Sequence, residues 1–106
     1  METNQMLKAL GEPMRFKIFN CLLERKHCVR SLSKKLGITE SAISQHIKVM
    51  KEAGLVYGEK YGYHIHYLPS KDALNLLVIC FTEMKEKSLA LDRDMTKCQC
   101  EYREVE

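Results

Sequence analysis

The residues of this chain with the most reactive chemistry are its five cysteines. An odd number of cysteines, with no signal-peptide core in residues 1–10, does not favour a disulfide framework, and cytosolic thiols stay reduced. We therefore expect a cytoplasmic protein whose thiols pack, bind a metal or undergo redox chemistry. Cys21 and Cys80 lie among apolar residues, where packing is the simpler interpretation. Cys98 and Cys100 are two residues apart, so both sulfur atoms can point to one centre.

A second group of side chains is suited to nucleic-acid binding. Within residues 36–56, LGITESAISQHIKVMKEAGLV, an apolar stripe at helical spacing is formed by Ile43, Ile47 and Met50. Glutamine can bond adenine bidentately, serine can bond bases or phosphate, and lysine suits phosphate. An ordinary amphipathic helix with a solvated polar side would show the same pattern, so its neighbours must decide. The face opposite the stripe carries Ser41, Ser44, Gln45 and Lys48.

The residues that lead into this helix predict the turn of a helix-turn-helix. Gly37 can adopt the left-handed conformation that ends a helix, here expected over residues 30–36. Thr39 can cap the next helix through its hydroxyl group, and Glu40 suits the positive end of the helix dipole. Two helices joined by a tight turn, the second with a hydrogen-bonding face, indicate a DNA-binding helix-turn-helix.

The residues after the helix predict a β-hairpin, which in this position is a wing. Residues 56–60 and 63–68 alternate and are rich in aromatic side chains. The tip is expected at residues 60–62, where Lys60 can reach backbone phosphate or the minor groove. His64 and His66 share one side of the second strand. A metal pair is conceivable, but no third ligand lies nearby in sequence, so solvent-facing or packed histidines are the favoured interpretation.

The remaining helices frame this motif. Short helices are expected at residues 5–10 and 13–24, joined to the next helix by a polar connection at residues 25–27. A long helix starts at residues 70–72 and is expected to run past Leu91. It exceeds what one subunit can cover, so we expect a homodimer with Leu74, Leu77 and Phe81 in the interface. Its apolar stripe alternates spacings of three and four: Leu74, Leu77, Phe81, Met84, Ser88, Leu91 and Met95.

Length and composition indicate one globular domain that is mainly α-helical with a β-hairpin wing. The chain has 106 residues, of which 45% are apolar and 29% charged, and its longest apolar run, residues 76–81, is too short to span a membrane. We expect a domain at residues 1–95 and a charged tail at residues 96–106. Residues 1–70 carry 11 Lys/Arg against 6 Asp/Glu, whereas residues 71–106 carry 6 against 8. A basic body suits a polyanion partner.

Three segments make the chain similar to a known family. Residues 10–15 (LGEPMR), 41–47 (SAISQHI) and 52–56 (EAGLV) resemble the ArsR-type (ArsR/SmtB) bacterial repressors, which include arsenic, metal and redox sensors. The resemblance covers roughly residues 5–92 and implies a winged helix-turn-helix that dimerises through its first and last helices. It also implies that the residues matching Ser41, Ser44, Gln45 and His46 lie at or near the DNA. By helical angle His46 falls beside the apolar stripe, which favours backbone contact or packing.

The resemblance carries over the family's sensing sites only in part. Arsenic and cadmium members have the segment C-V-C-D-L, and here it reads CVRSL, with Cys28 present and Arg30 in place of the second cysteine. Zinc and nickel members use histidines on the last helix, which has none here. Some members use C-terminal cysteines. We therefore predict that Cys28, Cys98 and Cys100 bind one soft ion, As(III) first and Cd(II) or a related metal second, since three thiolates suit a trigonal pyramid.

This site would tie the tail to the third helix and so couple the dimer to the DNA-reading helix, either within or between subunits. Nearby cations, Lys26, Arg30 and Lys97, favour the thiolate forms. Three alternatives remain: Cys98 and Cys100 are incidental tail residues; the thiols form a reversible disulfide or polysulfide switch; or the fold binds a protein partner instead of DNA. An enzyme is not expected, because no catalytic set of side chains stands out.

Overall fold

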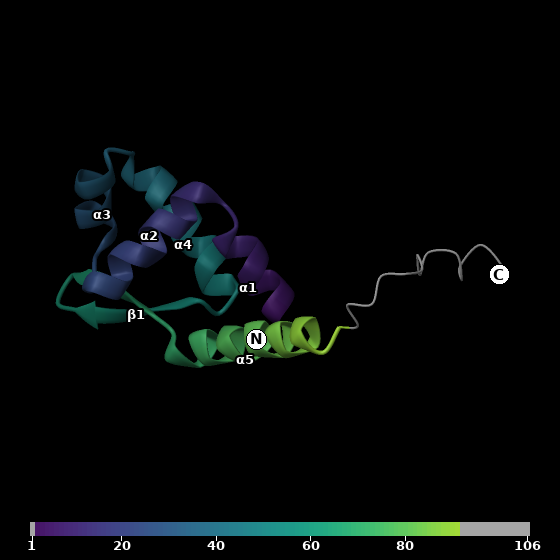
Figure 1. Ribbon diagram of the computed structural model, residues 1–106. Coiled ribbons are helices and arrows are strands. Elements are labelled where there is room, and N and C mark those ends of the chain that lie inside the picture. Colours follow the sequence, from purple (N-terminus) through teal and green to yellow (C-terminus); the bar gives the residue numbers. More distant parts are fainter. Residues whose placement is uncertain (1, 92–106) are drawn as a thin grey trace.

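The structure, a computed structural model, describes residues 2–91 of the chain (Figure 1). The expectations for Met95, for Cys98 and Cys100, and for the tail lie outside the described residues. Five helices and one antiparallel hairpin confirm the expected fold class, a mainly α-helical winged helix-turn-helix. The elements are α1 (Thr3–Leu10), α2 (Pro13–Glu24), α3 (Val29–Leu36), α4 (Glu40–Glu52), β1 (Val56–Tyr61), β2 (His64–Pro69) and α5 (Lys71–Leu89).

The helix ends follow from side chains that satisfy free backbone groups. Pro13 occupies the first turn of α2, where a missing N–H costs nothing, and Glu12 accepts a hydrogen bond from the Arg15 amide at 2.8 Å. Gly37, at a φ of 71°, ends α3 in the left-handed conformation. Thr39 then caps α4 by accepting a hydrogen bond from the Ala42 amide at 3.1 Å. The turn between α3 and α4 is therefore as the sequence predicts.

One hydrophobic core joins the elements. Its largest fully buried side chains come from α1 to α4 and from the residue before β1: Met6, Ile18, Leu32, Ile43, Met50 and Leu55. Ala73 and Leu77 on α5 close the core from the side opposite α3. In Figure 1, the hairpin and α5 lie along one side of the group formed by α1 to α4. Because each large apolar side chain contributes about 1.5–3 kcal/mol on burial, this shared core fixes α4 relative to the wing.

Three expectations about local structure are wrong. The wing tip is Gly62–Tyr63, because Lys60 and Tyr61 pair with β2 and leave a two-residue turn, the loop length that suits strand twist best. The helix α5 ends at Leu89 and does not pass Leu91: the Ala90 amide donates to Glu86 O, and the Leu91 amide closes a tighter turn by donating to Ser88 O.

No helix within residues 2–91 is long and apolar enough to cross a membrane.

The third error concerns residues 25–27, expected to be a plain polar connection. His27 forms an antiparallel bridge with Tyr67 of β2. The His27 amide donates to Tyr67 O at 3.4 Å, and the Tyr67 amide donates to His27 O at 2.7 Å. The histidine side chain is 4% exposed. The connection between α2 and α3 is therefore held to the edge of the hairpin by one isolated bridge.

Candidate nucleic-acid interface

The helix α4 separates its apolar and polar faces cleanly. Ile43, Ile47 and Met50 are buried, so this stripe holds the helix on the core. The face opposite the stripe is exposed at every position predicted to contact DNA: Ser41, Ser44, Gln45 and Lys48. From residue 41 to residue 48 this face extends about 10 Å along the helix, or about three base-pair steps. A short, rigid, hydrogen-bonding face of this length fits the major groove.

His46 lies beside this face and is half-buried. Its Nδ1 atom is 3.7 Å from Glu12 Oε2, so the ring faces the start of α2. Hydrogen bonds from the backbone amides of Arg15 and Met14 lower the pKa of the Glu12 carboxyl group, with smaller electrostatic contributions from His46 and Arg15. Because Glu12 also caps α2, one carboxylate contacts two helices. This position agrees with the helical angle that favours packing or backbone contact for His46.

The wing places Lys60 within β1, opposite Ile65, and not at the tip. Its side chain is exposed. The next residue, Tyr61, is held from three directions: Lys26 Nζ lies 3.8 Å from its ring centroid, the His66 ring lies 5.0 Å away, and its hydroxyl group donates to Glu59 Oε1 at 2.6 Å. Lys26 therefore belongs to the wing surface, although it lies 30 positions before Val56, the first residue of the wing.

Tyr63 occupies the tip of the wing and is fully exposed. Lys26 and Tyr63 are surface residues of this interface that were not predicted from the sequence. The two-residue turn rule, applied to Gly62 and Tyr63, would have identified the tip. Nothing local in the sequence indicates the contact of Lys26, because it depends on the bridge between His27 and Tyr67. His64 is exposed and His66 packs on Tyr61, as favoured over a metal pair.

Cys28 occupies the N-cap position of α3, without a capping hydrogen bond from its side chain, and is half-buried. Burial opposes ionisation of its thiol, but hydrogen bonds from the Ser31 amide, the Ser31 hydroxyl group and the Arg30 amide outweigh burial and lower the pKa of Cys28. The cause differs from the one predicted, which was the charge of the lysine and arginine side chains nearby. Thiolate formation is therefore favoured by the helix terminus itself.

A pocket of about 310 Å³ opens beside Cys28, between α3, the start of α4 and β2. Arg30, Glu40, Tyr63 and His64 also line it. Within residues 2–91, no three side chains of His, Cys, Asp or Glu converge closely enough to hold a metal ion. The predicted partners of Cys28, the thiols of Cys98 and Cys100, lie outside the described residues. Cys21 is buried in α2, and Cys80 is half-buried in α5.

The helix α5 and the residues directly after it expose apolar side chains around most of the helix circumference. Leu77 is 6% exposed and Leu74 packs against the core, so both are covered mainly by their own chain. Phe81 is 51% exposed. Of the three residues predicted in the dimer interface, Phe81 therefore has most surface free for a partner. The exposed apolar side chains of this segment are Leu76, Val78, Ile79, Phe81, Met84, Leu89 and Leu91, which we call the α5 face.

Comparisons with known proteins agree with this geometry. The sequence profile of bacterial regulatory proteins of the arsR family matches residues 12–57, from the cap of α2 into β1. The HTH-type transcriptional repressor SmtB of Mycobacterium tuberculosis is 38% identical over 63 residues, which are 59% of this chain and 47% of that protein. The chain therefore spans about half the length of this curated relative.

Two further matches cover more of both chains. The transcriptional activator HlyU of Vibrio cholerae is 30% identical over 73 residues, 69% of this chain and 68% of that protein. The crystal structure of a possible transcriptional regulator for arsenical resistance has a TM-score of 0.68 and 31% identity, covering 83% of this chain and 86% of that chain. These matches share the helix-turn-helix and the wing described above, so the chain belongs to the ArsR family of bacterial transcriptional regulators.

Proposed function

We propose that the protein is a homodimeric repressor that binds operator DNA through α4 and the wing and releases it when a thiophilic ion binds. The observation that carries the DNA-binding part is the exposed face of Ser41, Ser44, Gln45 and Lys48, backed by a fully buried stripe on the same helix. Gln45 is the candidate for base readout and Lys48 for phosphate. Lys60 on the wing adds a further phosphate contact.

Dimerisation supplies the geometry for reading two half-sites. The α5 face exposes seven apolar side chains in a chain of modest size, a large area to leave in water. Pairing α5 with a second copy would bury part of this apolar surface and relate the two α4 helices by a two-fold axis. Half-sites would then lie about 34–36 Å apart, one turn of DNA. One solved relative of the same fold is described as homodimeric, with 20% identity and a TM-score of 0.65.

For sensing, we propose that Cys28, Cys98 and Cys100 bind As(III) or another soft ion. The lowered pKa of the Cys28 thiol and its position at the start of α3 support this role. The residue after Cys28 begins the helix that packs on α4, and the residues after α5 lead to Cys98. A ligand held by both would connect the dimerising helix to the DNA-reading helix. No resident cofactor is needed, because the ion is the inducer.

The test is fluorescence anisotropy with DNA from the protein's own promoter. Affinity should fall steeply with salt, since phosphate contacts release counterions. Arsenite should release the wild type and Cys80→Ser, but not Cys28→Ser, Cys98→Ser or Cys100→Ser. Loss of salt dependence, or absence of any shift, would favour the protein-interaction alternative. If arsenite still releases Cys28→Ser, Cys98→Ser and Cys100→Ser fully from DNA, the proposed ion site is excluded.

The second candidate is a thiol redox switch using the same cysteines. The observation that favours it is again the lowered pKa of Cys28, because thiolates are the form that oxidants attack. A relative with 30% identity and a TM-score of 0.61 was solved as reduced HlyU of Vibrio cholerae. Release by a polysulfide or peroxide, without release by arsenite, would replace the ion-sensing proposal. The SmtB relative is a repressor and HlyU an activator, so reporter assays must establish the direction of regulation.

A further inference from the structure

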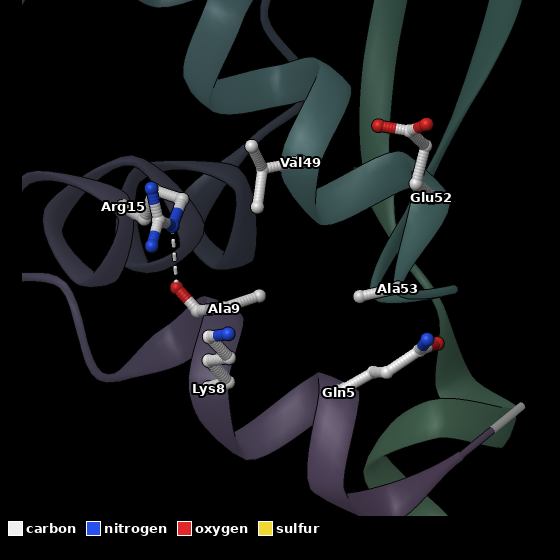
Figure 2. A pocket seen from close by; sticks show the side chains of 7 residues that line it. All are labelled: Gln5, Lys8, Ala9, Arg15, Val49, Glu52 and Ala53. Atoms are coloured by element: carbon white, nitrogen blue, oxygen red, sulfur yellow. Dashed lines mark hydrogen bonds between the residues drawn. The ribbon is translucent and has the colours of Figure 1, made fainter.

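A second pocket lies away from Cys28, between α1, the first turn of α2 and the last turns of α4 (Figure 2). Its volume is about 370 Å³, within the lower part of the range of small-molecule sites. Nothing in the proposed DNA or ion sites uses it. It is open to solvent, because Gln5, Lys8 and Glu52 at its rim are exposed.

The middle of this pocket is apolar. Ala9 and Ala53 are buried, and their short side chains leave the space unfilled. Val49 on α4 is 39% exposed and presents its isopropyl group to the same space. It is the one branched apolar residue of α4 that the chain does not bury. An aliphatic group of a ligand would cover this surface and remove it from water.

The charges of the pocket are divided between two walls. Lys8 and Arg15 lie on the wall formed by α1 and α2, and Glu52 lies across from them on α4 (Figure 2). Arg15 Nε donates to Ala9 O at 2.7 Å, which fixes the guanidinium group at this wall. Among the described residues, no ion pair within 4.0 Å joins Glu52 to either cation. The cations on one wall and the carboxylate on the other are therefore not paired with each other.

We propose that this pocket binds a small zwitterion, specifically an aliphatic α-amino acid. Its carboxylate would face Arg15 and Lys8, its ammonium group would face Glu52, and its side chain would lie on Val49 and the two alanines. Arginine suits a carboxylate because its planar fork can donate two parallel hydrogen bonds. A ligand with only one charge would leave the opposite wall without a partner. The inference does not depend on DNA binding or on the cysteines.

The consequence of occupancy is a link between three helices. The ligand would contact α1, α2 and α4, and α1 also packs against α5. The bound ligand would therefore hold α4 against α1 and α2, and α1 in turn contacts α5. Binding to the folded state alone would also raise the thermal midpoint as ligand is added.

The experiment is a ¹H–¹⁵N NMR titration of the reduced, DNA-free full chain with three compounds that share one aliphatic chain. Norleucine carries both charges, hexanoate only the carboxylate and pentylamine only the ammonium group. Norleucine should shift the amides of Ala9, Val49 and Ala53 and bind about fivefold more tightly than either analogue, the effect of one exposed ion pair. Equal or tighter binding of an analogue, or no shifts at these three amides, overturns the proposal.

Exposed variants then test the assignment of the charges. Glu52→Gln should weaken norleucine about fivefold and remove its advantage over hexanoate. Lys8→Gln should weaken norleucine and leave pentylamine unchanged. The matched controls, Glu40→Gln and Lys51→Gln, lie on α4 outside the pocket and should leave every affinity unchanged. The proposal is wrong if the controls weaken norleucine as much as the pocket variants do. It is equally wrong if neither pocket variant changes the affinity for norleucine. The assay contains no operator DNA, so its outcome is independent of the proposed DNA binding.

Discussion

The two longest helices within residues 2–91, α4 and α5, leave opposite kinds of surface exposed. The helix α4 buries its apolar stripe and presents serines, a glutamine and a lysine to solvent. The helix α5 buries only Ala73 and Leu77 and presents the α5 face. Both helices carry apolar residues at helical spacing, so periodicity alone does not distinguish their roles. The chemistry of the exposed side chains distinguishes them: the polar side chains of α4 suit a polar partner, and the apolar side chains of α5 suit an apolar partner.

The largest expected effect tests whether the exposed apolar residues of α5 form a dimer interface. Replacing Phe81 and Met84, which lie about one turn apart on the same side of α5, with Lys would place two charges in the proposed dimer interface and weaken dimerisation by about 4 kcal/mol, or about a thousandfold. Sedimentation velocity should show monomers that still melt cooperatively. Leu77 is unsuitable for this test, because its own chain buries it.

The matched control for that variant is Lys85→Gln, an exposed substitution on the same helix outside the apolar set. It should leave the dimer intact. A dimer that survives the double lysine substitution would show that another surface forms the interface. The assignment of the exposed apolar residues of α5 to a partner subunit would then be wrong.

The next effect tests the buried side of α4. Ile43→Ala should lower the free energy of unfolding by about 2–5 kcal/mol, because it removes a side chain that is fully buried and leaves a cavity. Gln45→Ala, two residues further along the helix, should change stability by less than about 0.5 kcal/mol. Urea unfolding of both variants makes the measurement. Similar losses for both would mean that the helix is rotated about its axis relative to the structure.

The exposed side of α4 is tested by DNA binding. Gln45→Ala should reduce discrimination at one base position by about 1–3 kcal/mol if the amide bonds adenine. Lys48→Ala should weaken all sequences alike and lower the salt slope by about one. Anisotropy against single-base operator variants separates the two results. The assignment fails if Lys48→Ala changes the sequence preference and Gln45→Ala does not.

The smallest effect concerns the pH dependence of Cys28. Its folded-state pKa is below the ordinary thiol value, so the thiolate persists as pH falls below that value and is lost only on passing the folded pKa. Alkylation by iodoacetamide should therefore begin at lower pH for Cys28 than for an unfolded-peptide control. Ser31→Ala should move the profile to higher pH, because it removes the hydroxyl hydrogen bond. An unchanged profile would assign no role to Ser31.

The sequence predicted those elements whose signals are local. Gly37 and Thr39 mark the turn of the helix-turn-helix by their own backbone and side-chain preferences, and the stripe of α4 repeats within one helix. The ArsR resemblance also rested on short local segments, residues 10–15, 41–47 and 52–56. Burial of Leu77 by its own chain was not predictable from heptad spacing, because spacing places a residue on a face without saying which neighbour covers it.

Features that depend on pairing between distant segments were beyond local patterns. His27 and Tyr67 meet only because α2, α3 and the hairpin surround one core. The wing tip differs from the predicted residues 60–62 because strand pairing extends to Tyr61, and this pairing depends on the register between β1 and β2. The pocket beside Val49 needs three helices to exist. Of the predicted ion site, only the position of Cys28 can be described, since Cys98 and Cys100 lie outside the described residues.

The bridge between His27 and Tyr67 has a mechanical consequence. It consists of two backbone hydrogen bonds, so its strength does not depend on which side chains occupy these positions. Cys28 is the next residue along the chain, only one Cα–Cα step of about 3.8 Å from the bridge. A force applied to its sulfur atom is therefore delivered to the wing as well as to α3.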